Sequence, residues 1–408
     1  MKFITEQINQ LRRAGLLRQF KTISAINGAK VKIGGKWYVS FCSNDYLGLA
    51  QHPALRKAAQ DAVRRFGVGS GASRLMAGTL TPHYQLEKAI ARFIGAQEAL
   101  LFTSGFVANL AVITTLIKEG DVVFSDEFNH ASLIDAIRLT RAKSFVYRHR
   151  DMAHLEALLK SSRSKLFPNH EPRTANYYII TDAIFSMDGD AAPLVDIVRL
   201  AKKYKCYTIV DEAHATGVFG KHGRGLAEHL ELSGKIDISI GTLSKAAGVI
   251  GGFVTGSKDF IAYIRSKGRP FIFTTSLPPA DCAAAIEAIN IIRTRPGLRR
   301  QLWAKTDYVK SRLAKYGFDL WVDAKRHPEV SGQGSASPII PVLIGDPKKT
   351  LKVSEYLWRK GLFIPAIRPP TVPADKSRLR ITISTLHNRV DLDYLIMQLV
   401  KAKQQHNF

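Results

Sequence analysis

Short apolar runs alternate with longer amphipathic stretches through the middle of the chain. Such runs are typical of buried strands, and the stretches between them follow the helical period. The expected strands are Ala99–Phe102, Val122–Ser125, Ser144–Tyr147, Tyr177–Thr181, Cys206–Asp211 and Ile236–Gly241, with Gly251–Gly256 as an extra strand. The expected helices are Val107–Leu116, Ala131–Leu139, Met152–Leu159 and Leu194–Tyr204. This alternation predicts an α/β fold, with a largely parallel sheet covered by helices on both faces.

The N-terminal part follows other patterns. Residues 3–20 place apolar side chains on one side of a basic amphipathic helix, and Ala29–Ser40 alternates around Gly34 and Gly35 as a hairpin does. Further helices are expected from Pro53 and from Thr81. A polar connector is expected over residues 161–176, and a short strand from Phe271 that stops at the following hydroxyls.

The C-terminal part predicts a smaller α+β unit. Its expected strands are Ile339–Ile344, Leu362–Ile367 and Leu379–Ser384, and its expected helices are Lys349–Lys360 and Asp391–Lys401. We therefore divide the chain into an N-terminal helix and hairpin segment (1–50), a large α/β domain (51–290) and a C-terminal α+β domain (291–408).

Composition narrows the class of protein. The chain has 408 residues, 46% of them hydrophobic and 23% charged, which is ordinary for a soluble globular protein. Its net charge of +25 invites a nucleic-acid partner, but the basic residues are spread along the chain, without an aromatic-interleaved basic stretch. We expect no nucleic acid and no membrane. The uncharged run from Ala99 to Ile117 is broken by Ser104, Gly105 and Asn109, and reads as strand, turn and helix.

The cysteines and the first residues favour a cytoplasmic protein. The chain has three cysteines, too few and too scattered for a disulfide framework or a zinc site, so we expect buried free thiols and no metal. Met1–Ile8 lacks the apolar segment of a secretory signal.

The candidate chemistry lies where strands end. Ligands of parallel α/β sheets collect beyond the carboxyl ends of the strands. Six residues of suitable chemistry fall at such positions: Ser104, His130, Ser186, Asp211, His214 and Lys245. Lys245 follows an apolar strand and precedes small residues, where a lysine whose charged form is disfavoured could attack a carbonyl as a Schiff-base nucleophile. A solvated loop lysine is the alternative for this stretch alone.

The combination of strand-end residues points to one cofactor. Asp211 ends a buried strand, His214 follows it, and Lys245 follows the next strand. Pyridoxal phosphate requires a carboxylate for its pyridinium nitrogen and a lysine for its aldehyde, so this constellation predicts pyridoxal phosphate. The glycine-rich stretch Gly67–Arg74 follows a helix rather than a strand, which disfavours a nicotinamide oxidoreductase.

The motifs resemble one family over nearly the whole chain. They are Asn44–Gly48, Ser104–Asn109, His130–Ser132, Phe185–Asp190, Asp211–His214 and Gly241–Lys245, in order and spacing similar to the α-oxoamine synthases. These are fold-type I pyridoxal-phosphate transferases. The resemblance implies a mostly parallel seven-stranded sheet in the large domain, a smaller C-terminal domain, and a homodimer with its active site at the subunit interface.

The resemblance also implies roles for individual residues. Lys245 carries the cofactor and moves the α-proton, Asp211 partners the pyridinium nitrogen, and His130 stacks on the ring. The other implied cofactor-binding residues are Ser186 and His214 at the phenolic oxygen, Ser104, Gly105, Phe106 and Thr242 at the phosphate, and Thr274 donated across the dimer interface. The implied substrate-binding residues are Arg380 for the amino-acid carboxylate, with Arg18, Asn44 and Thr371. Asp182 is assigned no role.

The segment Ile367–Pro373 bears on the substrate. It is similar to that of family members in biotin biosynthesis, which implies decarboxylative condensation of L-alanine with a pimeloyl group carried by coenzyme A or an acyl carrier protein. The alternative within the family is a glycine-using acetyltransferase. The high positive charge would suit an acidic acyl carrier protein as donor.

Overall fold

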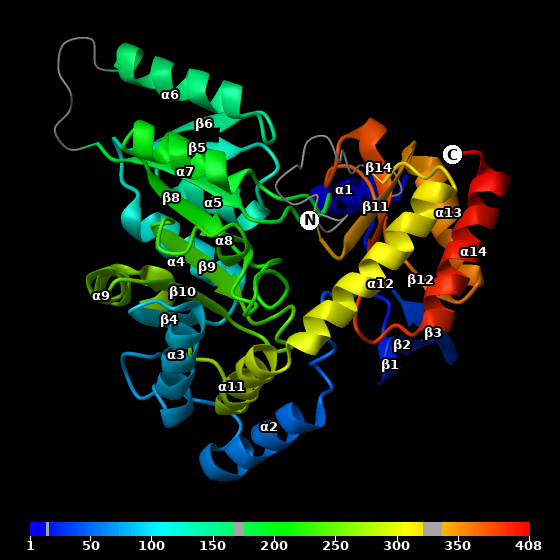
Figure 1. The fold of residues 1–408 in the computed structure, drawn as a ribbon, viewed down its shortest axis with the longest axis horizontal. Helices are drawn as coiled ribbons and strands as arrows, with labels where there is room; N and C mark the ends of the chain where they lie inside the picture. The colour runs from blue at the N-terminus through cyan, green and yellow to red at the C-terminus, as the bar shows by residue number, and fades with distance from the viewer. Residues whose placement is uncertain (14–15, 167–174, 321–336) are drawn as a thin grey trace.

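The computed structural model describes residues 1–13, 16–166, 175–320 and 337–408. Its larger lobe holds the central sheet and its helices, and its smaller lobe holds two short sheets made from both ends of the chain (Figure 1). The long helix α12 (Pro296–Lys315) runs from beside α11 (Pro279–Thr294) toward the smaller lobe (Figure 1).

The central sheet has seven strands in the order β4-β10-β9-β8-β7-β5-β6. They are β4 (Glu98–Phe102), β5 (Val122–Asp126), β6 (Lys143–Tyr147), β7 (Tyr177–Asp182), β8 (Tyr207–Asp211), β9 (Ile238–Thr242) and β10 (Gly252–Gly256). β10 pairs antiparallel with both β4 and β9, and the neighbouring pairs from β9 to β6 are parallel. The predicted α/β fold with a mostly parallel seven-stranded sheet is confirmed.

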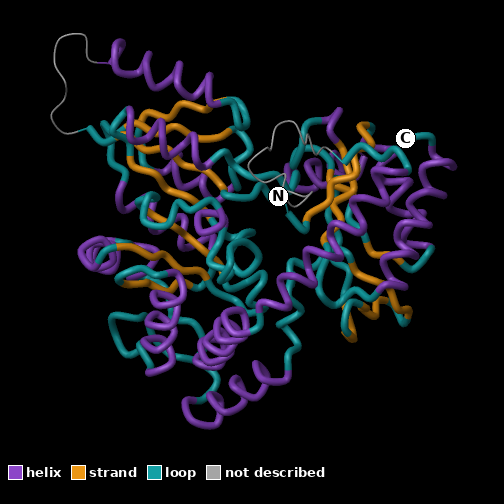
Figure 2. The backbone as a smooth tube through the Cα atoms, viewed as in Figure 1, coloured by secondary structure: helices purple, strands orange, loops and turns teal. Residues whose placement is uncertain are grey.

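Helices cover both faces of this sheet, as Figure 2 shows. The helices of the larger lobe, in addition to α11, are α2 (Pro53–Phe66), α3 (Thr81–Ile94), α4 (Gly105–Leu116), α5 (Ala131–Leu139), α6 (Met152–Leu166), α7 (Leu194–Lys203), α8 (Leu226–His229), α9 (Lys258–Lys267) and α10 (Arg269–Ile272). Among them, α2 packs against α11 rather than on the sheet (Figure 1). Successive strand residues enter opposite cores: Val122 and Phe124 pack in one hydrophobic cluster, and Val123 packs in the other. A strand that is buried on both faces reads as a continuous apolar run, which is why these strands are visible in the sequence.

The smaller lobe joins the two ends of the chain. One sheet has the order β1-β2-β3-β12 and the other has the order β11-β14-β13. Their strands are β1 (Ile23–Asn27), β2 (Lys30–Ile33), β3 (Lys36–Ser40), β11 (Ile339–Gly345), β12 (Leu362–Phe363), β13 (Ala366–Ile367) and β14 (Ser377–Thr382). The remaining elements are α1 (Lys2–Arg13), α13 (Pro347–Arg359), the short helix η3 (Ala374–Lys376) and α14 (Arg389–His406). The predicted hairpin at Gly34 and Gly35 forms β2 and β3.

Several predicted elements differ from the structure. The N-terminal helix ends at Arg13, and α6 continues into the predicted connector, whose residues 167–174 lie outside the described ones. The strand expected from Phe271 is wrong, because Arg269–Ile272 forms the short helix α10. The predicted strand Leu362–Ile367 is divided at Pro365 into β12 and β13, which join different sheets. A proline has no N–H for a ladder, and such a residue interrupts a strand.

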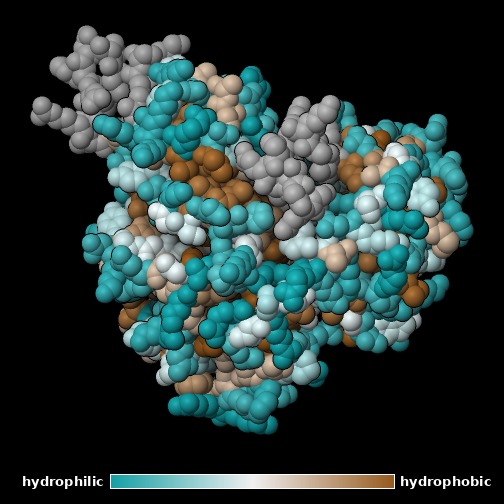
Figure 3. Space-filling model, viewed as in Figure 1, coloured by the Kyte–Doolittle hydropathy of each residue, from teal (hydrophilic) through white to brown (hydrophobic). Residues whose placement is uncertain are grey.

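Hydrophilic residues cover most of the face in Figure 3, and hydrophobic residues appear there in small groups. Among the described residues, no helix has the length and apolar character needed to cross a membrane. The three cysteines are free thiols.

Candidate active site

The carboxyl ends of β7, β8 and β9 bring acidic and hydroxyl side chains to one edge of the sheet. Asp182 ends β7, Asp211 ends β8, and the two are direct partners in the ladder. Thr242 ends β9, and Lys245 lies in the turn that follows. The predicted convergence of Asp211 and Lys245 therefore comes from the parallel register of adjacent strands.

Asp211 is buried in a hydrogen-bonded network. Its Oδ2 accepts from Nδ2 of Asn109 at 2.7 Å, and its Oδ1 accepts from the Ala213 N–H at 2.8 Å. The Asn109 amide also donates to Oγ of Ser132 at 2.8 Å, and that hydroxyl lies 2.7 Å from Nδ1 of His130. Asn109 thus links the predicted carboxylate to the predicted stacking histidine.

Asp182 is a second buried carboxyl group beside Asp211. It accepts a hydrogen bond of 2.6 Å from the His130 N–H, so it fixes the backbone of that residue. Burial and, next, the charge of Asp211 raise the pKa of Asp182 well above its ordinary value. A low-dielectric site holds one of two adjacent carboxyl groups in its neutral form.

The Lys245 amine is half-buried and faces these carboxyl groups. Burial lowers its pKa from that of an ordinary lysine, Asp211 and Asp182 oppose this effect, and Arg380 adds to it. The turn that holds Lys245 is fixed by Thr242, whose Oγ1 donates to the Gly251 carbonyl at 2.8 Å and accepts from Ser244 N–H at 3.1 Å. A lysine of lowered pKa is more easily deprotonated and is therefore a better nucleophile.

His214 is buried and neutral. Burial, followed by the positive charges of Lys245, Arg380 and His130, lowers the pKa of His214 well below its usual value. Its Nδ1 lies 2.7 Å from the Tyr46 hydroxyl, and that oxygen also interacts with Arg380. A guanidinium only donates, so the Tyr46 hydrogen is directed to Nδ1 and the proton of His214 lies on Nε2. His214 is thereby prepared as a neutral donor.

Arg380 is a buried cation on β14. Its Nε donates to the Ser186 carbonyl at 2.5 Å, and its terminal nitrogens donate to Oγ1 of Thr382 at 2.9 Å and Oδ1 of Asn44 at 3.1 Å. No salt bridge of the described part of the chain includes Arg380, and buried charges are ordinarily paired. The geometry therefore favours an anionic ligand for this guanidinium.

An open cavity of 480 Å³ lies against this cluster. His130, Ser186 and Thr371 line it, so three predicted residues from distant parts of the chain share one space. His130 is exposed into the cavity, as a residue that stacks on a ligand must be. Phe128, Phe185 and Arg378 also line the cavity.

The start of α4 forms a narrow backbone cradle. Ser104 is the N-cap, and its hydroxyl accepts from Val107 N–H at 3.2 Å. The first-turn amides of a helix have no acceptor within the helix, and here Gly105 lies against Thr242 and Gly252 lies against Ser104. A Cβ on Gly252 would lie 2.3 Å from the Ser104 carbonyl oxygen, so only glycine permits this approach. Phe106 is exposed. Such a helix start binds anions.

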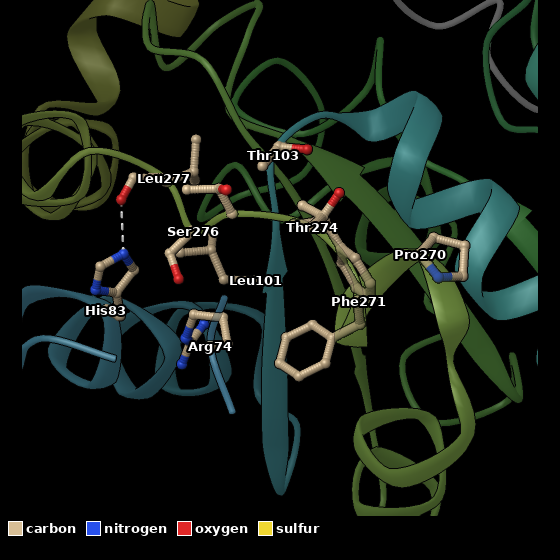
Figure 4. Close-up of a pocket in the computed structure, with 11 residues that line it drawn as sticks. Arg74, His83, Leu101, Thr103, Pro270, Phe271, Thr274, Ser276 and Leu277 are labelled. Carbon is tan, nitrogen blue, oxygen red and sulfur yellow. Dashed lines mark hydrogen bonds between the residues drawn. The ribbon is translucent and has the colours of Figure 1, made fainter. Parts of the chain in front are cut away.

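Thr274 is not among the residues that line the 480 Å³ cavity. It lines a small pocket with Thr103, Ser276 and Arg74, next to the start of α4 (Figure 4). In that pocket His83 lies 2.8 Å from the Leu277 carbonyl oxygen (Figure 4). Thr274 belongs to a residue set distinct from that of His130 and Ser186.

Arg18 is a predicted site residue that the structure does not bring to the cluster. It is exposed, and no described contact joins it to the cluster. Three site residues escape the analysis of the sequence alone, namely Tyr46, Asp182 and Asn109. Tyr46 and Asn109 lie within motifs that point to the family, which is the available signal for them.

Known proteins resemble this chain over its full length. The family described as aminotransferase class I and II matches residues 36–399. The 8-amino-7-oxononanoate synthase of Thermoanaerobacter pseudethanolicus is 44% identical over 407 residues, which cover 100% of this chain and 98% of that protein.

Two solved structures share the fold. A serine palmitoyltransferase from S. paucimobilis with bound PLP-myriocin superposes with a TM-score of 0.89, at 29% identity and over 99% of this chain and 97% of that one. An 8-amino-7-oxononanoate synthase from Francisella tularensis superposes with a TM-score of 0.74, at 25% identity and over 91% of this chain and 99% of that one.

Proposed function

The chain belongs to the class I and II aminotransferase family and groups there with the 8-amino-7-oxononanoate synthases, and on this premise we propose how its site works. The activity is the pyridoxal-phosphate-dependent condensation of L-alanine with a pimeloyl thioester in biotin biosynthesis. A carbon–carbon bond forms between the alanine α-carbon and the acyl carbonyl carbon. The thiol leaves, and the alanine carboxylate leaves as carbon dioxide.

The residues at the sheet edge fit pyridoxal phosphate. A half-buried amine, a buried carboxylate and a helix start with unpaired amides match the aldehyde, the ring nitrogen and the phosphate of this cofactor. Pyridoxal phosphate, when bound, supplies an aldehyde for the amino group and a pyridinium ring that accepts electron density from the α-carbon.

Five side chains position the cofactor in this proposal. The Asp211 carboxylate holds the proton on the ring nitrogen, and Asn109 and Ala213 N–H hold that carboxylate in place. The exposed His130 ring packs on the cofactor face. Nε2–H of the neutral His214 and the hydroxyl of Ser186 donate to the phenolic oxygen. The Ser104–Phe106 amides and Thr242 take the phosphate.

Lys245 and Arg380 act on the amino acid. Lys245, with its lowered pKa, takes the α-proton and returns a proton to the product. Arg380 lacks a carboxylate partner among the described residues and binds the substrate carboxylate, with Asn44 holding the guanidinium at 3.1 Å. When that carboxylate leaves as carbon dioxide, the buried charge loses its partner, which favours binding of the next amino acid.

The acyl group and the assembly complete the proposal. The cavity beside His130 and Thr371 accepts the acyl chain. The resemblance of the sequence to the family is the support for Arg18 as a further contact of the acyl substrate. We further propose a cytoplasmic homodimer in which Thr274 reaches the partner's cofactor, with domains at 1–50, 51–290 and 291–408 and no nucleic-acid or membrane partner. An assay with both thioesters distinguishes coenzyme A from an acyl carrier protein as the donor of the acyl group.

The observation that carries this function is the juxtaposition of Lys245 and Asp211 at the ends of adjacent parallel strands, next to Arg380, which has no carboxylate partner in the described part of the chain. The test is to load the purified protein with pyridoxal phosphate and to record a yellow absorbance that shifts on addition of L-alanine. Lys245→Ala is expected to abolish this absorbance, and the exposed Lys258→Ala is expected to retain it.

Substrate choice is measured in the same preparation. L-alanine, glycine and L-serine are each offered with pimeloyl-coenzyme A, with the pimeloyl carrier protein and with acetyl-coenzyme A, and the release of free thiol is recorded. L-alanine is expected to give the fastest release. Faster release with glycine and acetyl-coenzyme A would move the chain to another reaction of the same family, and a colourless protein would exclude the family's chemistry altogether.

A further inference from the structure

His149 is held between two carboxylates behind the cavity wall. Its Nδ1 lies 2.8 Å from Oδ1 of Asp126, and its Nε2 lies 2.8 Å from Oδ2 of Asp190. The side chains of all three residues are 13% exposed or less. A histidine bonded through both nitrogens to carboxylates donates twice, which is the pattern of the protonated ring.

Two aromatic rings separate His149 from the cavity. Phe128 stacks on it with ring centres 4.5 Å apart, and Phe185 meets it edge-on at 4.4 Å. Both phenylalanines line the cavity, next to His130 and Ser186 respectively. His149 therefore supports the inner wall of the site from the side opposite the ligand.

Asp126 organises the segment that carries His130. The Oδ1 atom bound to His149 also accepts from Phe128 N–H at 2.9 Å, and Oδ2 accepts from Arg150 N–H at 2.9 Å. The carboxylate thus closes the turn after β5, two residues before Phe128 and four before His130. Movement of Asp126 would shift the ring that faces the cavity.

Asp190 organises the segment that carries Ser186. Its backbone carbonyl accepts from Phe185 N–H at 3.0 Å, and Ile184 forms an isolated bridge with Ala191. This closed turn presents Ser186 to the cavity. His149 consequently joins the turn of His130 to the turn of Ser186 through its two ring nitrogens.

The local charges agree with a protonated ring. Burial lowers the pKa of His149, but the hydrogen bonds and charges of Asp126 and Asp190 outweigh burial and raise its pKa to about 9. The other charged groups that face it are Glu127 from the turn after β5, Asp188 from the 183–191 turn and Arg150 beside it in the chain. Asp188 is itself paired with Arg378.

We propose that His149 is a positioning residue of the active site, whose two hydrogen bonds fix the distance between His130 and Ser186 and thereby the affinity for the cofactor. This inference rests on the proposed function. It concerns a residue outside the cavity, and it makes the cofactor affinity depend on the charge of a group that does not touch the ligand.

The first experiment compares His149→Gln with the matched control His154→Gln. His154 lies five residues further on, in α6, and its Nδ1 accepts a hydrogen bond of 3.0 Å from the Arg148 N–H. The dissociation constant for pyridoxal phosphate is measured by absorbance at pH 7.5, with circular dichroism as the check of folding. We expect the dissociation constant to be at least tenfold higher for His149→Gln and unchanged for His154→Gln. Equal constants in the two folded variants would overturn the proposal.

The second experiment follows pH and needs no variant of His149. The histidine resonances of the ligand-free protein are titrated by NMR, and His149 is expected to keep its proton to about pH 9. Because its folded pKa is raised, the stabilisation is complete below pH 6.5 and is lost as pH rises through about 9. The dissociation constant of the wild type for pyridoxal phosphate is therefore expected to rise over that pH interval. The rise is expected to be larger than the one measured for Asp190→Asn.

The outcomes separate the two proposals. A wild-type protein that never binds pyridoxal phosphate contradicts the proposed function, and the NMR titration then tests whether Asp126 and Asp190 hold His149 in its protonated form. A wild type that binds the cofactor, together with a His149 that titrates at or below pH 6.5, contradicts the positioning role alone. If His149→Gln does not fold, Asp190→Asn supplies the binding comparison, and an unchanged constant in it overturns the proposal.

Discussion

Asn109 uses both hydrogens of one buried amide nitrogen on groups of the site. Those hydrogens go to Asp211 at 2.7 Å and to Ser132 at 2.8 Å. The same nitrogen therefore holds the Asp211 carboxylate, which we propose as the partner of the cofactor's ring nitrogen, and, through Ser132, the ring of His130. A single amide that satisfies two functional groups has no isosteric replacement that keeps both bonds.

The first prediction concerns Asn109→Ala. The substitution leaves the buried Asp211 carboxylate with the Ala213 N–H alone, and an unsatisfied buried acceptor costs about 1–3 kcal/mol. We expect this loss in the free energy of unfolding of the ligand-free protein, measured in urea, and weaker binding of pyridoxal phosphate. The exposed Asn290→Ala in α11 is the control and is expected to stay within about 0.5 kcal/mol of the wild type. A wild-type-like stability of Asn109→Ala would contradict the network.

The second prediction concerns His214 and acid. The folded pKa of His214 lies well below its ordinary value, mainly because the ring is buried, so the unfolded chain binds a proton below about pH 6.5 that the folded chain does not. Stability therefore falls on acidification from pH 6.5. One such proton changes the slope by about 1.4 kcal/mol per pH unit.

The measurement is the urea midpoint between pH 7 and pH 5, in the wild type and in His214→Asn. Asparagine does not titrate, so the variant is expected to lose this part of the slope while other groups keep theirs. An identical slope in the two proteins would show that His214 is protonated in the folded state, and this would remove the neutral donor from the mechanism.

Among the secondary-structure elements, β10 has an unusual task. It runs antiparallel between β4 and β9, and its first residue, Gly252, lies against the Ser104 carbonyl at the start of α4. The strand therefore forms one wall of the cradle that we assign to the phosphate. The close approach requires a residue without a Cβ.

The third prediction concerns Gly252→Ala. A Cβ there would lie 2.3 Å from the Ser104 oxygen and 2.6 Å from the Gly105 nitrogen, so the start of α4 must move. Overpacking of this kind costs about 1–3 kcal/mol. We expect that loss in urea unfolding and a cofactor dissociation constant raised about tenfold or more.

Gly297→Ala is the matched control for this substitution. Gly297 lies in the first turn of α12, and the nearest atom to an added Cβ is 3.8 Å away. A helical alanine in place of glycine is expected to stabilise the protein by about 0.5–1 kcal/mol. Equal effects of the two substitutions would mean that the cradle tolerates a side chain, and the glycine at the start of β10 would then need another explanation.

The elements that the sequence predicts well are those buried on both faces. The runs around Val123, Ile180 and Val210 have apolar centres and are almost entirely buried, and they are strands of the sheet. The failures come from segments whose structure depends on distant partners. Leu362–Ile367 is one apolar run, but Pro365 divides it, so that β12 pairs with β3 near the other end of the chain and β13 pairs with β14. Local pattern contains no information on such pairing. β1 is missed for a different reason, because most of its residues are exposed and its sequence contains no apolar run.

The same distinction applies to the site. Lys245, Asp211 and His130 stand at strand ends or helix starts, positions that a pattern of elements can locate. Asn109, Asp182 and His149 act through hydrogen bonds to residues between 23 and 102 positions away. Their side chains occur in ordinary helix, strand and turn contexts. Their roles therefore follow from their hydrogen bonds in the folded chain and not from the sequence pattern.

For the whole molecule, the amino-acid subsite depends on contacts between distant parts of the chain. Arg380 of the smaller lobe donates to the Ser186 carbonyl, 194 positions earlier, and to Asn44, 336 positions earlier. Arg378 is paired in the same way with Asp188. In the proposed function, the carboxylate of the amino acid is therefore bound where the smaller lobe contacts the larger one, and it would leave as carbon dioxide at that junction.

The fourth prediction belongs to the whole molecule, because it depends on the net charge of +25. A field of this sign attracts a polyanionic acyl donor from a distance and raises its rate of association. The coenzyme A thioester carries several negative charges, whereas L-alanine has none in net. Salt is therefore expected to weaken the capture of the thioester and to leave that of alanine unchanged.

The measurement is KM for each substrate at rising sodium chloride concentration, from about 0.05 M to about 0.5 M, over which the screening length falls several-fold. We expect KM for the thioester to rise about threefold or more, with kcat constant, since screening acts on the encounter and not on the enclosed Lys245 and Asp211. A parallel rise in KM for L-alanine would point to a change in the site itself. A constant KM for the thioester would mean that the positive surface has no part in acyl-donor capture, and the charge would then need a different partner.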